Sequence, residues 1–398
     1  MNELRGRIVT AQREYPHARL TWEGGRIAGI EELPGPAPQE AMTVIPGLVD
    51  LHNHGGFRGA FPTGSAEECL RAVRFHRAQG TTTMLASLVS GTERELSRQV
   101  GVLRELVEQG ELQGIHLEGP FINAARCGAQ APSRIQPGDP DMLRRLVAAS
   151  KSTVRQITFA PETARARELV EVCAEYGIIA SLGHTDASAE EVRGILAYAR
   201  DRGVTVTATH LFNGMPPLHH RAPGPVAALI EAAARGEAWV ELIADGVHLS
   251  DATVDMVTAA APEHALAVTD AMEAAGMPDG EYQLGPLRVE VREAVARLRT
   301  EGGEPGVIAG GTSTLARQFW NYQRRHGAVA AVRLTSAHAA RVLGMTESAG
   351  DLRGGMPATF VALDAQGEVA EVWRGGERCR DGAEESGAEE SGQAARRK

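Results

Sequence analysis

Two histidines separated by a single residue follow an apolar run near the start of the chain. The stretch GLVDLHNHGG at 47–56 places His52 and His54 at the end of a potential β-strand. Side chains alternate between the two faces of a strand, so both imidazoles point to the same side. Two neutral imidazoles at the open end of a strand suit a divalent metal, although this stretch alone fits two polar residues in a surface turn equally well. Other ligands must decide between the two interpretations.

Further polar side chains stand at the same point of later β-rich runs, where each run ends. They are Glu118, His184, His210, Asp245, His248 and Asp270. One strand-end histidine alone is more often structural than a ligand, but a whole set in the same strand phase favours a metal site. An imidazole-rich set selects Zn²⁺ or Fe²⁺, because Mg²⁺ prefers oxygen ligands.

One or two ions per chain are compatible with this set. Glu118, His184 and His210 could hold one ion and leave a position open for water. His52 and His54 could hold a second ion, with Glu118 or a hydroxide as the bridge. Asp270 is the candidate for proton transfer, because an aspartate beside an activated water can accept its proton and later donate it to a leaving group.

The β-rich runs that position these residues alternate with helical patterns, which is typical of a parallel α/β sheet. The candidate strands span residues 43–51, 81–88, 112–118, 154–162, 178–184, 204–210, 239–245 and 265–271. Capping boxes at Ser65–Glu68, Thr92–Glu95 and Ser188–Glu191 predict helix starts between them. Eight strand–helix repeats predict a (β/α)₈ TIM-type barrel, whose active site lies at the carboxyl ends of the strands.

The two flanks of the barrel have a different pattern. Residues 1–45 and 352–378 contain short strands and tight turns, such as the hairpin at Gly24–Gly25. Neither flank has enough apolar residues for its own core, so together they predict one small β-sandwich domain beside a barrel at 46–351. Residues 379–398 contain an EESG repeat and dense charge, so we expect a disordered tail.

Composition narrows the possible partners and the compartment. The net charge of −10 argues against a nucleic-acid or anionic-membrane surface. We find neither a signal peptide nor roughly 18 uninterrupted apolar residues that could span a membrane. The cysteines are scattered without a CxxC pair, which favours a reducing compartment and predicts a cytoplasmic protein. They are Cys69, Cys127, Cys173 and Cys379.

Over residues 44–363 a series of motifs resembles a known family. The motifs are PGLVDLHNHG, HLEGPF, GHTDAS, THLFNGMPPLHHRAPG, ADGVH, TDAM and IAGGT. They resemble the amidohydrolase superfamily and, within it, the N-acetylglucosamine-6-phosphate deacetylases. Many binuclear amidohydrolases bridge their metals with a carboxylated lysine on strand four. Here the two lysines, Lys151 and Lys398, lie in the wrong places, which weakens hydantoinase-like and dihydroorotase-like interpretations.

The resemblance implies hydrolysis of the acetamide of N-acetyl-D-glucosamine 6-phosphate, in amino sugar catabolism and cell-wall sugar recycling. It implies that Glu118, His184 and His210 are the primary metal ligands and that Asp270 is the general base and acid. N-acetylgalactosamine 6-phosphate differs from this substrate at one hydroxyl group, so a deacetylase of that sugar remains an alternative. Another metal amidohydrolase, or a non-catalytic barrel, is also compatible with the sequence.

The resemblance also implies a set of substrate-binding residues. They are Ala129, Gln130, Asn213, Gly214, Arg221, His248, Ile308, Ala309 and Gly310. Arg221 and His248 match phosphate-binding positions, and the arginine can come from a neighbouring subunit in the family, so a homodimer is expected. Gln130 replaces a histidine that donates to the acetyl carbonyl in many members. Either the Gln130 amide or a second metal ion could polarise that carbonyl.

Overall fold

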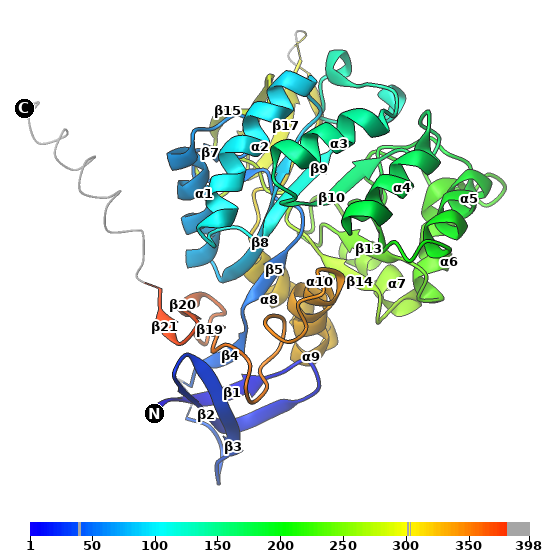
Figure 1. Ribbon diagram of the computed structural model, residues 1–398. Coiled ribbons are helices and arrows are strands. Elements are labelled where there is room, and N and C mark those ends of the chain that lie inside the picture. The colour runs from blue at the N-terminus through cyan, green and yellow to red at the C-terminus, as the bar shows by residue number, and fades with distance from the viewer. Residues whose placement is uncertain (39–40, 301, 303, 380–398) are drawn as a thin grey trace, which may run out of the picture.

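A sheet of eight parallel strands forms the centre of the protein, in a computed structural model that describes residues 1–38, 41–300, 302 and 304–379 (Figure 1). Across the sheet the strands are β5 (Leu48–Asp50), β8 (Thr81–Leu88), β9 (Gly114–Glu118), β10 (Val154–Phe159), β11 (Ile179–Leu182), β12 (Val206–Ala208), β13 (Trp239–Leu242) and β14 (Ala265–Ala267). Each lies within a predicted run. Beyond β5 and β14, His54 N donates to Ala271 O at 2.7 Å and Asp270 N donates to His52 O at 2.8 Å. These bonds close the sheet into the predicted TIM-type barrel.

Helices surround the sheet in the order expected for strand–helix repeats (Figure 1). They are α1 (Ala66–Ala78), α2 (Glu93–Glu108), α3 (Pro140–Ala149), α4 (Ala166–Tyr176), α5 (Ala189–Arg200), α6 (Gly224–Ala234), α7 (Asp251–Ala260) and α8 (Leu315–His326). The three predicted capping boxes are confirmed at the starts of α1, α2 and α5. After α8 come α9 (Ala328–Val332), a π-helical turn (Arg333–Ala337) and α10 (His338–Val342). The π-helical turn packs against both β5 and β14, so it covers the seam of the barrel.

Both flanks of the chain build a second, seven-stranded sheet, as predicted. Its order is β21 (Glu377–Arg378), β20 (Val369–Arg374), β19 (Phe360–Leu363), β4 (Thr43–Pro46), β1 (Asn2–Val9), β2 (Glu14–Glu23) and β3 (Arg26–Glu32). The antiparallel pair β4–β19 joins the N-terminal strands to the C-terminal ones. Trp22, Phe360 and Trp373 form the aromatic core, with ring centroids 4.9–5.6 Å apart. Most of the tail that we predicted at 379–398 lies outside the described residues.

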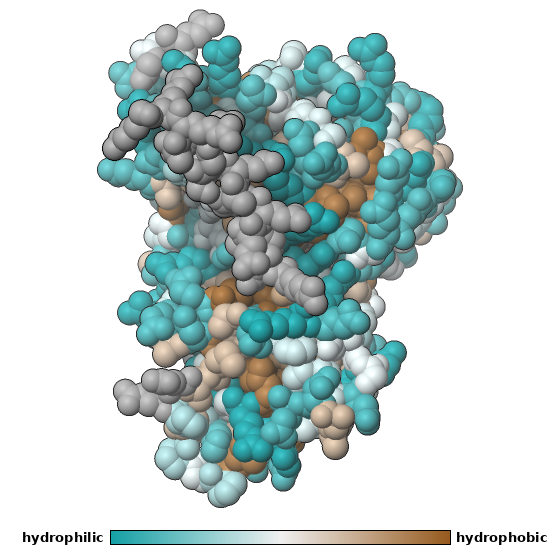
Figure 2. All heavy atoms as spheres, turned by 90° about the vertical axis from the view of Figure 1, so that its left-hand side faces the viewer, coloured by the Kyte–Doolittle hydropathy of each residue, from teal (hydrophilic) through white to brown (hydrophobic). Residues whose placement is uncertain are grey.

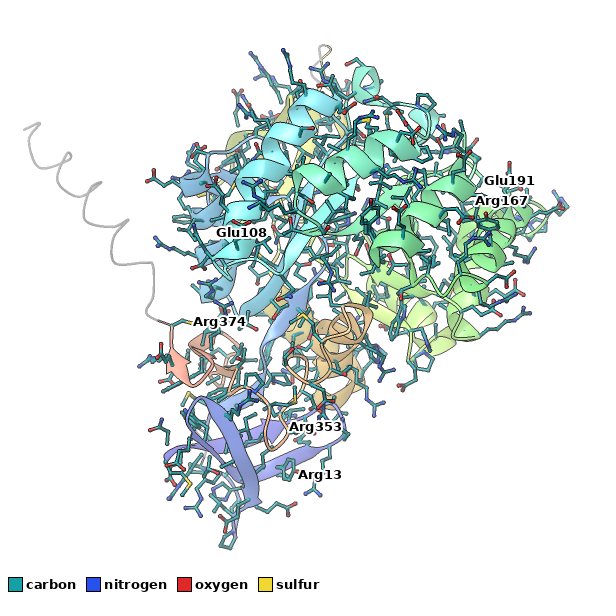
Figure 3. The ribbon with its side chains drawn as sticks, in the orientation of Figure 1. Arg13, Glu108, Arg167, Glu191, Arg353 and Arg374 are labelled. Carbon is teal, nitrogen blue, oxygen red and sulfur yellow. The ribbon has the colours of Figure 1, made fainter. Side chains whose placement is uncertain are left out.

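Arginine side chains connect this β domain to the barrel. Arg374 of β20 donates to the carbonyl of Gly110 after α2, at the junction visible in Figure 3. Arg333 donates in the opposite direction, from the barrel to the carbonyl of Ala11 at 2.8 Å. Charged side chains elsewhere, such as Glu191 and Arg353, lie on the outer surface in the same view.

The first predicted strand, 43–51, is in fact two strands that belong to different sheets. β4 pairs within the β domain and β5 within the barrel, and Gly47 lies between them. A Cβ atom at Gly47 would lie 2.1 Å from Thr82 Oγ1 and 3.0 Å from Thr359 Cγ2. The chain therefore passes between the two sheets through a space that admits no side chain.

A four-stranded antiparallel sheet follows β14, and the sequence analysis missed it. Its strands are β15 (Gly280–Leu284), β16 (Leu287–Arg292), β17 (Val295–Arg299) and β18 (Pro305–Ile308). Alternating apolar residues, including Val289 and Val291, pack with Met272 in a separate small core. The face of the molecule in Figure 2 is mostly hydrophilic, with hydrophobic side chains in a few separate areas. Among the described residues we find no helix long and apolar enough to cross a membrane.

The passage at Gly47 gives a first prediction. Gly47→Ala should lower the free energy of unfolding by ~1–3 kcal/mol, the usual cost of overpacking a filled interior. Thermal or urea unfolding monitored by circular dichroism measures the change. Gly194→Ala is the matched control, because Gly194 is exposed within α5 and its Cβ would contact nothing within 4 Å. A Gly47→Ala protein as stable as the Gly194→Ala protein would contradict the steric argument.

Candidate active site

Two carboxylates and four imidazoles meet at the carboxyl ends of the barrel strands. They come from the ends of β5, β9, β11, β12 and β14, in the order His52, His54, Glu118, His184, His210 and Asp270. Glu118 Oε1 lies 2.9 Å from Nε2 of both His184 and His210, and Glu118 Oε2 lies 3.3 Å from Nε2 of His54. Asp270 Oδ1 lies 3.4 Å from His52 Nε2 and 3.3 Å from His54 Nε2. The Glu118 carboxylate therefore lies between the histidines of opposite strands.

Two groups within this cluster have the spacing of a metal site. One is His52, Glu118 and His210, and the other is His52, His54 and Asp270; in each, one ligand atom per residue lies within 4.8 Å of the others. His52 belongs to both groups, and His184 contacts the first through Glu118 Oε1. The cluster thus offers two adjacent positions for a cation that share a histidine.

Neighbouring carbonyl groups fix the orientation of two of the imidazoles. His184 Nδ1 donates to Arg126 O at 2.8 Å, and His54 Nδ1 donates to Ser87 O at 3.1 Å. A carbonyl can only accept, so each Nδ1 carries a proton and leaves Nε2 as the nitrogen available to a metal when the ring is neutral. Both Nε2 atoms face Glu118.

The backbone at three of these residues adopts a conformation that L-residues rarely take. His184, His210 and Asp270 have φ values of 47°, 27° and 48°. Residues in the left-handed region persist only where the surrounding structure holds them, and they concentrate at functional sites. Each of the three lies two or three residues beyond the end of a parallel strand, so the turn in the backbone directs the side chain into the cluster.

Opposite charges dominate the electrostatics of the cluster. Burial alone lowers the pKa of His52, but the carboxylates of Glu118 and Asp270 overcome it and raise that pKa well above its ordinary value. Burial raises the pKa of Glu118, yet the nearby His52 and His184 hold that pKa well below its ordinary value. Burial likewise opposes the ionisation of Asp270, but His52 and His54 lower its pKa. The buried carboxylate of Glu118 and the largely enclosed one of Asp270 therefore require positive charge, and a divalent cation bound by imidazole nitrogens fits this donor set.

A buried polar layer under the cluster contains residues that the sequence analysis did not identify. Glu241 of β13 is fully buried and accepts from Gln156 Nε2 and Thr207 Oγ1, both at 2.8 Å. His116 of β9 contacts Ser87 Oγ at 2.9 Å and Thr158 Oγ1 at 2.8 Å, and burial lowers its pKa well below the ordinary value. A carboxylate in the middle of the apolar run WVELIA was the available signal for Glu241.

Asp50, which the sequence analysis also missed, connects the segments that carry His52 and Asp270. Its Oδ2 accepts from Thr269 Oγ1 at 2.6 Å and from Asn53 Nδ2 at 3.1 Å, and its Oδ1 accepts from Thr269 N at 3.2 Å. Burial raises the pKa of Asp50, and these hydrogen bonds oppose that shift. The carboxylate therefore holds the two ends of the barrel sheet together directly below the cluster.

Several of the predicted substrate-binding residues lie beside the cluster. A Cβ atom at Gly214 would lie 2.7 Å from His184 Nδ1, and Asn213 Nδ2 donates to His210 O at 3.2 Å. The Gly310 backbone lies against Asp270, because a Cβ atom there would be 3.0 Å from Asp270 O. Ile308 ends β18, and Ala309 N donates to Ala296 O at 3.0 Å.

Gln130 and Ala129 lie in the loop after β9. The Gln130 side chain is buried, and its Oε1 accepts from Ser90 N at 2.8 Å. Its Nε2 has no hydrogen-bond partner in the part of the chain that the structure describes. The Gln130 amide group is thus held by its oxygen, while its donor nitrogen is buried and unpaired among the described residues. Ala129 packs against the small core of the four-stranded sheet.

Two predicted residues make no hydrogen bond or ion pair with the cluster within the described ranges. Arg221 lies in an exposed loop, where its guanidinium contacts His220 Nε2 at 2.7 Å. His248 follows β13, and its Nδ1 lies 2.8 Å from Asp245 Oδ2. The structure of a single chain therefore collects the predicted metal ligands and Asp270, but it leaves Arg221 apart from them.

Comparison with known proteins places this site in a family. Residues 43–379 match the Amidohydrolase family. The chain belongs to the Amidohydrolase family. Members of this family are metal-dependent hydrolases, and the His/Glu/Asp cluster of this member could bind a metal.

Similar amidohydrolases act on phosphorylated amino sugars. N-acetyl-D-glucosamine-6-phosphate deacetylase from Mycobacterium smegmatis, solved in complex with N-acetyl-D-glucosamine-6-phosphate, is 37% identical with a TM-score of 0.86, and the match covers 94% of this chain and 98% of that one. N-acetylgalactosamine-6-phosphate deacetylase from Escherichia coli O157:H7 is 30% identical over 92% of this chain and 96% of that protein. N-acetylglucosamine-6-phosphate deacetylase from Vibrio furnissii is 30% identical over 91% and 90%.

The raised pKa values of the cluster imidazoles predict how metal uptake depends on pH. Burial lowers the pKa of His52 and of His54, but the carboxylates of Glu118 and Asp270 more than offset this effect and raise both pKa values, so the metal-free cluster binds protons more tightly than free imidazoles do. A cation that binds these nitrogens must displace the protons, so metal affinity should rise with pH. Calorimetric titration of stripped protein with Zn²⁺ in two buffers of different ionisation enthalpy measures the protons released. Equal heats in the two buffers would contradict this prediction.

Proposed function

We propose that this amidohydrolase hydrolyses the acetamide of N-acetyl-D-glucosamine 6-phosphate to D-glucosamine 6-phosphate and acetate. The observation that carries the proposal is the convergence of four imidazoles with Glu118 and Asp270 at the barrel mouth. Similarity to deacetylases of this sugar over almost the whole chain supports the choice of substrate. Free cysteines, as at Cys69 and Cys173, agree with action in the cytoplasm, where such sugars would be catabolised or recycled from the cell wall.

The cluster residues would hold one or two divalent ions. Glu118, His184 and His210 would bind one ion. His52 and His54, with Asp270 beside them, would bind a second. The many imidazole nitrogens favour Zn²⁺ or Fe²⁺. When bound, such an ion supplies Lewis acidity that lowers the pKa of water toward ~7 and polarises the amide carbonyl.

Asp270 would carry the proton through the reaction. The imidazoles beside it lower its pKa against the effect of burial, so Asp270 is ionised and can accept a proton at neutral pH. It would take the proton from the attacking water and donate it to the nitrogen of the departing amine. Its position at the rim, with a side chain that is 14% exposed, leaves it accessible to a substrate.

Residues beside the cluster would orient the acetylated sugar. The Gln130 Nε2 group would donate to the acetyl carbonyl, because Ser90 already holds the other end of the same amide. Asn213 and Gly214 would contact the sugar and phosphate, while Ala129 and the backbone of Ile308, Ala309 and Gly310 would line the sugar end of the pocket.

The phosphate would bind to His248 and Arg221. Arginine presents a planar donor pair that matches two phosphate oxygens. Because Arg221 is exposed and contacts its neighbour His220, we propose that it completes the site of a second protomer in a homodimer.

A second candidate substrate is N-acetylgalactosamine 6-phosphate. The similarity to the Escherichia coli O157:H7 deacetylase of that sugar covers 92% of this chain and supports this alternative. The metal cluster and Asp270 would perform the same chemistry on either sugar, so only contacts to a single hydroxyl group would distinguish them.

An acetate-release assay tests the proposed activity. Protein that has been stripped of metal and reloaded with Zn²⁺ or Fe²⁺ should release acetate from N-acetyl-D-glucosamine 6-phosphate, faster than from the galactose isomer. It should release little from either unphosphorylated sugar. As a test of the phosphate contact, Arg221→Ala should raise KM strongly for the phosphorylated sugar, and Arg167→Ala, an exposed arginine on α4, should not. Equal rates with and without the phosphate would contradict the proposal.

Asp270→Asn tests the proton-transfer role. The substitution keeps the size of the side chain and removes its basicity, so kcat should fall by at least ~10²-fold, the usual size of an acid–base contribution. Metal binding at the Glu118 position should stay largely intact, which elemental analysis of the purified variant would measure. A kcat close to that of the parent would remove Asp270 from this role.

A further inference from the structure

Glu241 is a buried carboxylate without a charged partner in the polar layer that surrounds it. Its side chain is 0% exposed, and its Oε1 accepts from Gln156 Nε2 and Thr207 Oγ1 at 2.8 Å. These donors are neutral. Its second oxygen, Oε2, lies 3.4 Å from the amide nitrogen of His210 and 3.6 Å from Nδ1 of His52. A carboxylate removed from water is costly unless a positive or strongly polarised group faces it, so His52 is the group that can balance Glu241.

The His52 ring has one buried nitrogen that faces the Glu241 carboxylate. Its Nδ1 is buried and has no hydrogen-bond partner within the described residues, and Glu241 Oε2 faces that nitrogen. The other ring nitrogen, Nε2, faces the cluster, 3.0 Å from His54 Nε2 and 3.4 Å from Asp270 Oδ1. The imidazole therefore lies between a carboxylate below it and the metal ligands above it.

This arrangement determines which nitrogen carries the proton. A carboxylate at Nδ1 favours the tautomer with the proton on Nδ1, and that tautomer leaves the Nε2 lone pair for a metal. For His54 and His184 a backbone carbonyl does the same task, whereas for His52 only a side chain is in place. A carboxylate also makes the imidazole a stronger ligand than a carbonyl does, because it stabilises positive charge on the ring.

We propose that Glu241 is a positioning residue that fixes His52 and thereby sets the occupancy of the metal position formed by His52, His54 and Asp270. Glu241 touches no substrate in this scheme and acts through His52. The inference rests on the proposed function only in assuming that the cluster binds metal. It identifies a residue on which a second ion depends, below the ligands themselves.

Metal binding by Glu241→Gln tests the inference without any measurement of activity. The substitution keeps the side-chain size and removes the charge. Stripped parent and variant are titrated with Zn²⁺ in competition with a chromophoric chelator. The parent should bind two ions per chain, and the variant should bind one of them about 10- to 100-fold more weakly, the usual effect of removing an outer-shell partner. The affinity for the other ion should change little.

Thr207→Val is the matched control. It removes one donor to Glu241 Oε1 from the same buried layer and leaves the carboxylate facing His52. Its unfolding temperature should fall, but both ions should bind as in the parent. In a His52→Asn background, Glu241→Gln should have no additional effect on metal affinity, because the coupling passes through that imidazole.

Clear outcomes would overturn the inference. The first is that Glu241→Gln binds two ions with the affinities of the parent. The second is that Glu241→Gln and Thr207→Val lose the same amount of metal affinity. The third is that the parent binds a single ion. If Glu241→Gln does not fold, nitrogen-15 spectra of histidine-labelled parent protein loaded with Zn²⁺ decide the question, because His52 must carry its proton on Nδ1. A parent that binds two ions but releases no acetate would refute the proposed function and leave this inference standing.

Discussion

Closure of the barrel between β5 and β14 is the constraint on which the site depends. Asp270 and the histidine pair are far apart in the chain, and they meet because Asp270 N donates to His52 O and His54 N donates to Ala271 O. Asp50 strengthens this seam through Thr269. A seam that opened would separate Asp270 from the histidine pair and from Glu118, and the imidazoles would lose one of the carboxylates that balance their charge. Closure of the barrel thus brings together the predicted metal ligands from distant segments of the chain, so the fold itself forms the site.

The layer beneath the predicted ligands is polar, and its hydrogen bonds extend toward the segments that carry the imidazoles. Interiors of TIM-type barrels are usually filled with branched apolar side chains. Here Ser181, Thr158, Thr207 and Thr209 form a chain of hydroxyl contacts of 2.6–2.8 Å that reaches His116 on one side and Glu241 on the other. Each buried polar group costs free energy unless it is paired, so such a layer is stable only when almost every member has a partner. The result is a rigid platform that fixes imidazoles in one orientation.

The sequence revealed the elements whose signals are local. The capping boxes of α1, α2 and α5 and the eight apolar runs were predictable, because a few neighbouring residues determine each of them. The division of the first strand at Gly47 was not predictable, because it depends on Thr82 and Thr359, which are distant in sequence. The four-stranded sheet was missed although Val289 and Val291 alternate with polar residues, since its position after β14 falls where a barrel helix was expected. Glu241 and Asp50 were missed for a related reason: their roles arise from contacts across strands.

Chemistry and specificity also differ in how far a sequence determines them. The predicted metal ligands and Asp270 lie at strand ends or within four residues of them, where the closed sheet fixes their positions. The residue types and their strand phase were therefore enough to predict a metal site with an aspartate for proton transfer, whereas the reaction itself was predicted from the resemblance to a family. The residues that we propose to recognise the sugar and its phosphate lie on segments that the sheet does not fix, such as the exposed loop of Arg221 and the segment 308–310 at the end of β18. Loops tolerate change because few buried contacts constrain them. If the proposed roles hold, a shift of one such loop would change the preferred hexosamine epimer without moving Glu118, because the loop and the strand-end residues are positioned by different parts of the fold.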